Sequence, residues 1–152
     1  MQNVNTVKDI LDSKGREVWS IAPSKSVLEA VEFMVEKSVG ALTVVDGDKH
    51  LVGIISERDA ARKVLMKEAS PRETWVEDIM TREVFTVNES ASVDRCLAQM
   101  AGRKIRHLPV MNEDALVGIV AAVDVFKYII RDQLTTIEEL ENYVKDETGG
   151  SG

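Results

Sequence analysis

The segment Gly53–Asp59 (GIISERD) places a serine and an aspartate at a spacing that could bind a nucleotide. Its apolar residues predict a strand that ends at Ser56, and a helix should begin soon afterwards. Backbone N–H groups at the N-terminus of a helix bind phosphate, and the carboxylate of Asp59 could accept hydrogen bonds from both hydroxyls of a ribose. The same Ser-x-x-Asp spacing also forms an ordinary helix capping box, and for the motif taken alone capping is the favoured interpretation.

The segment Gly118–Asp124 (GIVAAVD) repeats this pattern with one change. The aspartate recurs, but Ala121 stands where the first segment has Ser56. Asp124 could still cap a helix without the serine, so the comparison does not separate capping from ligand binding. The missing hydroxyl predicts that a site at Asp124 is weaker, empty or specialised for a less charged group.

A basic cluster occupies Gly102–His107 (GRKIRH) in a chain whose net charge is −7. The forked guanidinium of Arg106 suits a phosphate, and His107 could add a hydrogen bond. The alternative is a solvated loop whose cations are favoured by the C-terminal end of a helix dipole. The matching segment Lys37–Ala41 is nearly uncharged, so we do not expect the two halves to treat a phosphate equally.

Two aromatic residues, Trp19 and Phe85, stand at equivalent positions in the two halves of the chain, although aromatic residues make up only 5% of it. Such a pair could form the wall of two purine sites. Packing within two equivalent cores explains the pair at least as well.

The net charge of −7 limits the classes of function. Binding to nucleic acid or to an anionic membrane needs a basic face, so neither is expected. The N-terminus lacks the pattern of a signal peptide, and the apolar runs are far shorter than the roughly 20 residues that span a bilayer. The single cysteine, Cys96, excludes an intrachain disulfide, and we expect a cytoplasmic protein.

Patterns typical of catalysis or metal binding are lacking. His50, His107 and Cys96 do not have the spacing of a metal site, and neither a Gly-rich phosphate loop nor a nucleophile elbow occurs. Cys96 falls on the apolar face of a predicted helix, so we expect burial rather than a catalytic pair with His107. We therefore predict no enzyme activity, no metal and no catalytic cofactor.

The motifs belong to two copies of one longer pattern. Residues 18–65 align with residues 84–130, and Val7–Leu11 aligns with Val76–Met80. The length differences fall in turns, where insertions are tolerated. One copy of roughly 55 residues would bury little core alone, so we expect the two copies to pack together.

Each copy predicts a lead-in helix and then strand, helix, strand, strand and helix. Apolar residues recur at helical spacing in one segment of each copy, and Asp46-Gly47 marks a hairpin turn in the first. The predicted fold class is α/β (α+β), with a small mixed three-stranded sheet in each repeat and helices on one face. The expected strands are 18–21, 41–45, 51–56, 84–87, 107–111 and 116–121, and the expected helices are 27–35, 93–100 and two that begin near Asp59 and Asp124.

Four parts of the chain follow from this pattern. The first repeat with its lead-in and linker covers 1–72, and the second covers 73–131. Residues 132–147 predict a separate acidic helix that packs against the module or a neighbour. Residues 148–152 (TGGSG) have the composition of a flexible tail.

The ordered set of motifs resembles the cystathionine-β-synthase (CBS) domain. VKDIL and VEDIM, GALTVVD and RHLPVMN, and GIISERD and GIVAAVD carry the resemblance, which covers residues 7–130 and has the form of a stand-alone, bacterial-type CBS pair, or Bateman module. The resemblance implies two repeats related by a pseudo-twofold axis, two clefts between them, and a disc-like homodimer formed through helical faces.

The resemblance also implies the residues of each cleft, in which the motif aspartate binds ribose. The main cleft would use Ile54, Ser56, Arg58, Asp59, Met80, Val84, Phe85, Ile105, Arg106 and His107. The second, weaker cleft would use Lys14, Trp19, Val39, Gly40, Ala41, Ile119, Ala121, Val123 and Asp124.

The expected function is that of a regulatory module. It would bind an adenine nucleotide (AMP, ADP or ATP) or a dinucleotide such as NAD or NADH, and report energy or redox state to a protein partner. The alternative is an interaction scaffold whose ligand sites are degenerate.

Overall fold

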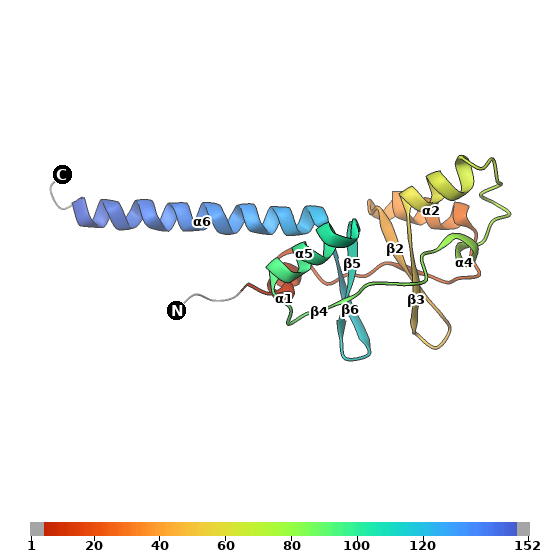
Figure 1. Ribbon diagram of the computed structural model, residues 1–152, viewed down its shortest axis with the longest axis horizontal. Coiled ribbons are helices and arrows are strands. Elements are labelled where there is room, and N and C mark those ends of the chain that lie inside the picture. Colours follow the sequence, from red (N-terminus) through yellow and green to blue (C-terminus); the bar gives the residue numbers. More distant parts are fainter. Residues whose placement is uncertain (1–4, 149–152) are drawn as a thin grey trace.

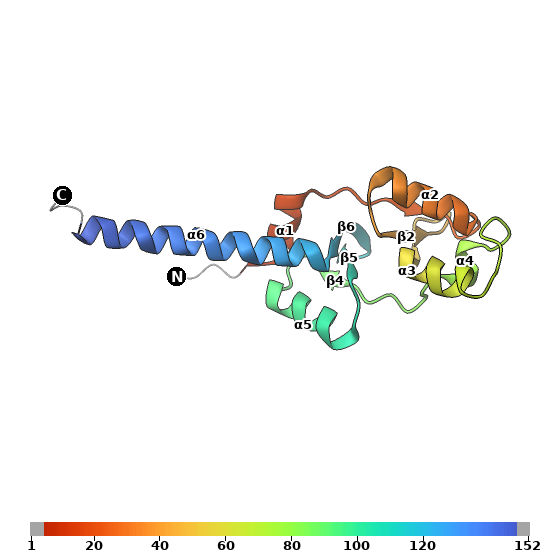
Figure 2. The same ribbon diagram turned by 90° about the horizontal axis from the view of Figure 1, so that it is seen from above.

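The computed structural model describes residues 5–148, with side chains described as far as Lys145, so the predicted tail at 148–152 lies outside them except for Thr148. Two similar halves stand side by side, and one long helix projects from the second half (Figures 1 and 2). The first half contains α1 (Val7–Lys14), β1 (Ser20–Ile21), α2 (Val27–Lys37), β2 (Ala41–Val45), β3 (Leu51–Ser56), α3 (Glu57–Ala60) and the π-helix η1 (Ala61–Leu65). The second contains α4 (Val76–Ile79), β4 (Val87–Asn88), α5 (Val93–Arg103), β5 (His107–Asn112), β6 (Ala115–Ala121) and α6 (Ala122–Thr148).

Each half has a mixed three-stranded sheet, which confirms the predicted fold class. The strand orders are β1-β2-β3 and β4-β5-β6, with the first pair parallel and the second antiparallel in both sheets. The registers also match, since Ile21 pairs with Val44 and Val87 pairs with Val110. The two halves therefore share strand pairing as well as element order.

A serine caps the start of α2 in the first half and of α5 in the second, and a residue in the left-handed conformation ends each of these two helices. Ser26 Oγ accepts the N–H of Glu29 at 3.1 Å, and Ser92 caps α5 in the same way. Ser38 (φ 56°) ends α2 and Lys104 (φ 54°) ends α5 in the αL conformation. This ending turns the chain sharply, so that the basic cluster leads directly into β5.

The short lead-in helices are exchanged between the halves. Helix α1 precedes the first repeat, but it packs into the core of the second, against β4, β5, β6 and α5. Helix α4 precedes the second repeat, but it packs into the core of the first. The residues concerned are Val7, Ile10 and Leu11 in the second-repeat core, and Val76, Ile79 and Met80 in the first-repeat core.

The exchange explains one glycine in each half. A Cβ atom on Gly118 would lie 2.8 Å from both methyl groups of Leu11, and one on Gly53 would lie 2.5 Å from Met80 Sδ and 3.0 Å from the carbonyl oxygen of Thr81. The third strand of each sheet therefore needs glycine where the lead-in helix from the other repeat crosses it. Because the exchange is reciprocal, it agrees with two halves related by a pseudo-twofold axis.

Helix α6 differs from the prediction of a separate helix at 132–147. It runs without a break from Ala122 to Thr148, and its residues 130–145 are all exposed, so the acidic segment packs on neither half (Figure 1). No glycine or proline interrupts 122–148, and the sequence therefore offers no physical reason for a boundary at 132. Within residues 5–148 no helix is both long and apolar enough to cross a bilayer.

Candidate ligand-binding clefts

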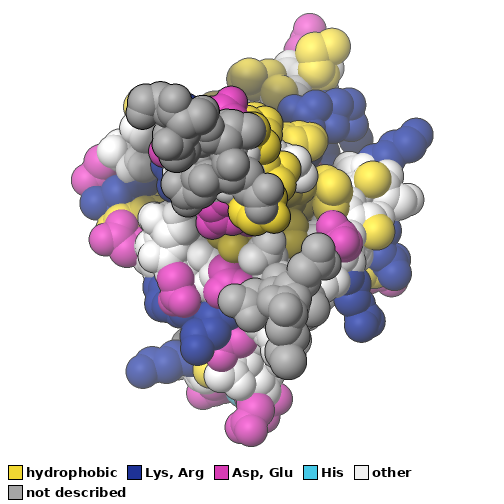
Figure 3. Space-filling view, turned by 90° about the vertical axis from the view of Figure 1, so that its left-hand side faces the viewer, with side chains coloured by type: hydrophobic (Ala, Val, Ile, Leu, Met, Phe, Trp, Pro, Cys, Tyr) yellow, Lys and Arg dark blue, Asp and Glu magenta, His cyan; other side chains and the backbone are white. Residues whose placement is uncertain are grey.

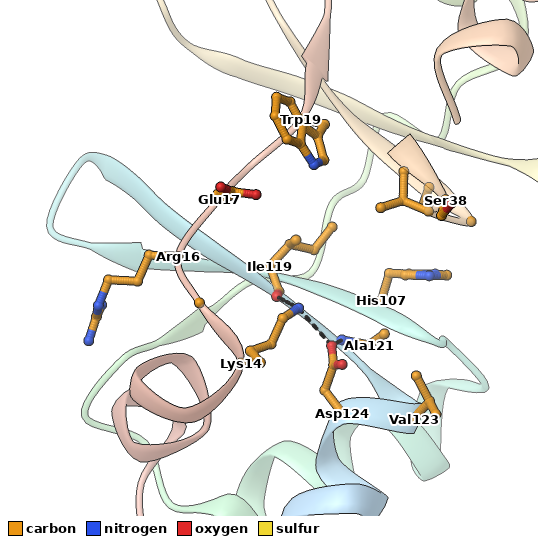
Figure 4. A pocket seen from close by; sticks show the side chains of 14 residues that line it. Lys14, Arg16, Glu17, Trp19, Ser38, His107, Ile119, Ala121, Val123 and Asp124 are labelled. Atoms are coloured by element: carbon orange, nitrogen blue, oxygen red, sulfur yellow. Dashed lines mark hydrogen bonds and ion pairs between the residues drawn. The ribbon is translucent and has the colours of Figure 1, made fainter. Parts of the chain in front are cut away.

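A cleft of about 590 Å³ opens beside Asp124, between the start of α6 and the connection that follows α1 (Figure 4). We call it the Asp124 cleft. All nine residues predicted for the second cleft line it. Its lining residues are Lys14, Gly15, Arg16, Glu17, Trp19, Ser38, Val39, Gly40, Ala41, His107, Ile119, Ala121, Val123 and Asp124.

The Asp59 cleft, with a volume of about 370 Å³, lies at the equivalent place in the first half. It is lined from three directions: by β3 with α3 and η1, by the connection after α4, and by the basic cluster before β5. Its lining residues are Gly40, Ile54, Ser56, Glu57, Arg58, Asp59, Arg62, Thr81, Glu83, Val84, Phe85, Lys104, Ile105, Arg106 and His107.

Nine of the ten residues predicted for the main cleft line the Asp59 cleft. Met80 is the exception and corrects the prediction. Its side chain is 7% exposed and packs over Gly53 in the first-repeat core, so Thr81 takes its place at the cleft wall.

Sequence reasoning missed several lining residues. In the Asp124 cleft they fall mainly in the segment Asp12–Glu17, which comprises the end of α1 and the residues after it and is longer than the aligned segment Thr81–Glu83. That length difference was a usable signal, because extra residues next to a cleft are expected to line it. The missed residues are Gly15, Arg16, Glu17, Ser38 and His107 in the Asp124 cleft, and Gly40, Glu57, Arg62, Thr81, Glu83 and Lys104 in the Asp59 cleft.

Asp59 serves as a capping residue in this structure. Its Oδ2 accepts the backbone N–H of Ser56 at 3.0 Å and the Ser56 hydroxyl at 3.1 Å, while Ser56 Oγ accepts the N–H of Asp59 at 3.1 Å. Its Oδ1 lies 3.3 Å from Lys63 Nζ. The capping contacts therefore occupy Oδ2, whereas Oδ1 makes the longer contact with Lys63.

Asp124 is held more tightly, and from a distant segment. Its Oδ2 accepts the N–H of Ala121 at 2.8 Å and lies 2.7 Å from Lys14 Nζ, which also donates to the carbonyl of Ile119 at 2.7 Å. Figure 4 shows Lys14 reaching across to Asp124, whereas Arg16 points away from it. The backbone N–H of Ala121 thus supplies the capping hydrogen bond, and the absent hydroxyl does not prevent it.

The cations of the two clefts differ in whether they are already paired. In the Asp124 cleft, Lys14 pairs with Asp124, and Arg16 pairs with Asp12 and with Glu89 at 3.5 Å. In the Asp59 cleft, none of the four cations forms an ion pair within the part of the chain that the structure describes. These four residues are Arg58, Arg62, Lys104 and Arg106.

Trp19 and Phe85 were each considered either as the wall of a ligand site or as a core residue, and each ring occupies both kinds of position. Both rings line a cleft and also pack against a hydrophobic core. Each ring carries a cation over its face: Lys37 Nζ lies 4.4 Å from the Trp19 ring centroid, and the Arg103 guanidinium lies 3.8 Å from that of Phe85. The aromatic pair therefore forms equivalent walls whose ring faces are held by cation–π contacts.

His107 is shared by the two clefts, since it lines both and faces Gly40 between them. Burial lowers its pKa below the usual value for histidine, with Lys14 and Arg106 acting in the same direction and Asp124 and Glu57 opposing them. The ring is therefore neutral near pH 7 and can either donate or accept a hydrogen bond.

Outside the clefts, two features bear on the chemistry. Cys96 is fully buried in the second-repeat core, and burial raises the pKa of its thiol to about 11, so it is a core residue as expected. Among residues 5–148, one group of three potential metal ligands occurs, Asp46, Asp48 and His50 at the β2–β3 turn. There Asp46 Oδ1 accepts the N–H groups of Asp48 and His50 at 2.9 Å, so this carboxylate stabilises the turn.

The chain matches the family model for the CBS domain twice, at residues 7–66 and 76–131. It is 34% identical over 149 residues to the CBS domain-containing protein CBSX3, mitochondrial, of Arabidopsis thaliana, covering 92% of this chain and 72% of that protein. A CBS-domain protein from Burkholderia ambifaria MC40-6, described as a signal-transduction protein, has a similar structure. Its TM-score is 0.82 at 43% identity, and the match covers 85% of this chain and 96% of that one.

A further solved structure bears on ligands. The CBS domain pair of protein MJ0100, in complex with 5′-methylthioadenosine and S-adenosyl-L-methionine, has a TM-score of 0.75 at 31% identity. The match covers 86% of this chain and 99% of that one. Two sheets with exchanged lead-in helices, and a cleft at each motif aspartate, define a CBS pair, a class of module that is typically regulatory rather than catalytic. The chain belongs to the CBS-domain family.

Proposed function

We propose that this CBS pair binds an adenine nucleotide (AMP, ADP or ATP) or an adenine dinucleotide (NAD or NADH), chiefly in the Asp59 cleft. The observation that carries the proposal is the set of four cations in that cleft that form no ion pair with the described residues, next to a motif aspartate and an aromatic wall. Cations that converge on one cleft without an ion-pair partner attract a phosphate, because their charge is not already neutralised by a carboxylate in direct contact.

The distribution of groups suits the parts of such a ligand. Phe85 and Ile54 offer an apolar wall for the base, and Asp59 Oδ1 offers an acceptor for a ribose hydroxyl. Arg58 and Arg106 stand on opposite repeats, so a phosphate that both contact would join the two halves. The adenosine-containing ligands of the MJ0100 pair support this choice of ligand class.

We further propose that the module works as a homodimer and passes the state of the cleft to a protein effector. A ligand shifts a conformational equilibrium only by its differential affinity for two states. A phosphate held by both repeats would favour the state in which they lie close together, and an effector that contacts both repeats could detect it.

A scaffold with degenerate sites is the second candidate, and the Asp124 cleft favours it. There the motif carboxylate is already neutralised by Lys14, so a ligand would have to break a 2.7 Å ion pair to reach Asp124.

Calorimetric titration with AMP, ADP, ATP, NAD, NADH and S-adenosylmethionine tests the proposal. Asp59→Asn keeps an oxygen for the cap but removes the charge, and we expect it to weaken nucleotide binding about tenfold, as for loss of a charge-assisted hydrogen bond. We expect a smaller effect from Asp124→Asn. The matched control is Asp9→Asn, because Asp9 makes the same capping contact to Thr6 in α1 and lines neither cleft.

Two results would count against the proposal. If no ligand of the panel binds, the scaffold function is favoured. If Asp59→Asn binds as the Asp9→Asn control does while Asp124→Asn binds weakly, the Asp124 cleft is the main site.

A further inference from the structure

Helix α6 carries an apolar stripe that packs on nothing within residues 5–145. The stripe is formed by Phe126, Ile130, Leu134, Ile137 and Leu140, which are each 50–60% exposed. Figure 3, which looks at the end of the molecule from which α6 projects, shows hydrophobic side chains gathered on one side of this helix. The opposite side of its first turns is already occupied, because Val125 is fully buried in the second-repeat core.

The spacing of the stripe is that of a coiled coil. Counted through Gln133, the residues Phe126, Ile130, Gln133, Ile137 and Leu140 are separated alternately by four and three positions, as at positions a and d of a heptad. Ile130 and Ile137 take position a, Phe126 and Leu140 take position d, and Gln133 is a polar d residue between them. Leu134 takes position e beside the seam, which widens the apolar surface.

The exposed second half of α6 would gain stability from a partner. Isolated helices shorter than about 12–15 residues are marginal in water, and most helical stability comes from packing of an apolar face. Residues 130–143 are all exposed, and none of them belongs to either hydrophobic core of the described residues.

We propose that this stripe pairs with the same stripe of a second copy, with the two α6 helices antiparallel. The pairing involves a surface away from the Asp59 cleft, and it goes beyond the proposed homodimer by naming the helix, the orientation and the register. It does not depend on nucleotide binding.

Charge decides the orientation. Two of the three basic residues of α6, Lys127 and Arg131, lie in its first part, and the third, Lys145, lies in its last turn. The segment between them carries Glu138, Glu139 and Glu141. A parallel pair would place the three glutamates level with their own copies, and like charges repel. An antiparallel pair places the basic part of each helix beside the acidic part of the other.

One antiparallel register satisfies the apolar and the charged positions together. With the twofold axis level with Thr135, Ile130 lies level with the partner's Leu140, and Gln133 with the partner's Ile137. In the same register, position e lies two residues, or about 3 Å, from the level of its counterpart, so that Leu134 lies near the partner's Leu134 beside the seam. With the same offset Lys127 lies near the partner's Glu141, and symmetry makes this contact twice.

Single cysteines in the full chain test the orientation. Under mild oxidation, Leu134→Cys should form a disulfide-linked dimer, because position 134 meets its own copy only in the antiparallel pair. Gln133→Cys should not, since position d meets its own copy in a parallel pair. The unsubstituted chain is the background control, because its Cys96 is fully buried. Crosslinking of Gln133→Cys but not of Leu134→Cys would overturn the orientation.

Charge reversal tests the register. Lys127→Glu and Glu141→Lys should each weaken association about tenfold by sedimentation equilibrium, because each places like charges together at two symmetric sites. The double variant should recover most of the loss. Glu139→Lys, at a position that points away from the seam, is the matched control. Failure of the double variant to recover would contradict the register.

Ile137→Glu tests the surface itself. It should remove one step of association and so lower the mass of the assembly in solution, whereas Thr135→Glu on the outer side of the same helix should not. Circular dichroism checks that the CBS pair stays folded in both variants. An unchanged mass for Ile137→Glu, together with the absence of a Leu134→Cys crosslink, overturns the proposal.

Discussion

Equivalent segments of the two repeats line the Asp59 and Asp124 clefts, but the charges of the two clefts are in different states. In the Asp124 cleft, Lys14 and Arg16 are both paired with carboxylates. In the Asp59 cleft, Arg58 and Arg106 are not paired within the described chain.

The cause of this difference is local. The segment from Asp12 to Glu17, which includes the last turn of α1, is longer than its counterpart from Thr81 to Glu83. Its extra length brings Lys14, at the end of α1, to the motif aspartate of the other repeat. The duplicated backbone therefore determines where each cleft lies, whereas the short segment before β1 determines whether the motif aspartate of the Asp124 cleft is paired with a lysine.

The largest effect should come from the glycines at which the lead-in helices cross. Gly118→Ala should lower the free energy of unfolding by about 2 kcal/mol, the usual cost of overpacking, because both methyl groups of the buried Leu11 are in the way. Gly53→Ala should cost a similar amount, because the Thr81 carbonyl cannot move aside as the flexible Met80 can. Urea denaturation measures both effects.

The control for these variants is Gly102→Ala. A Cβ atom there meets nothing within 4 Å, and alanine favours the helix, so we expect a stabilisation of about 0.5 kcal/mol. If Gly118→Ala is as stable as Gly102→Ala, α1 does not cross β6 as described.

A smaller loss in the free energy of unfolding is expected when either of the two lysines that contact the motif aspartates is replaced. Lys14→Met should cost about 1 kcal/mol, because its side chain is 29% exposed and its ammonium group bonds both Asp124 and a carbonyl oxygen. Lys63→Met should cost about half of that. Lys63 makes the same two kinds of contact, to Asp59 at 3.3 Å and to the Ile79 carbonyl oxygen at 2.8 Å, but its side chain is 41% exposed and its ion pair is longer. Urea denaturation in low and high salt measures both losses. Equal losses would contradict the conclusion that Asp124 is held more tightly than Asp59.

The smallest effect concerns His107, which both clefts share. Burial lowers its pKa in the folded protein, so as the pH falls through about 6.5 the unfolded chain takes up a proton that the folded chain resists. This group therefore contributes stability near neutral pH that is progressively lost below about 6.5. Urea denaturation between pH 5.5 and 7.5 should show a weaker pH dependence for His107→Gln than for the unsubstituted chain.

The exposed His50 provides the matched control for that measurement. His50→Gln should keep the pH dependence of the unsubstituted chain, because the ring of His50 is 74% exposed. If both variants behave alike, water reaches His107 in the folded protein.

Much of the fold could be predicted, because its determinants are local. Helical spacing in α2, the Asp46-Gly47 turn and the apolar runs of β3 and β6 each act within a few residues. Membership of the clefts was implied by the resemblance of the motifs, and the structure brings those residues together except for Met80. That error has a physical reason, since an apolar side chain at the end of α4 gains more from burial over Gly53 than from a half-open wall.

The sequence by itself determined the duplication, the strands and helices of each repeat, and the motif aspartate that marks each cleft. These features depend on periodicity and on capping, both of which are determined by residues close together in the chain. Only the tertiary structure decided that the lead-in helices are exchanged, that Lys14 neutralises Asp124, and that the apolar stripe of α6 is left exposed. Those outcomes depend on contacts between segments far apart in the chain, and the free energies of such contacts are set by distance and burial rather than by sequence order.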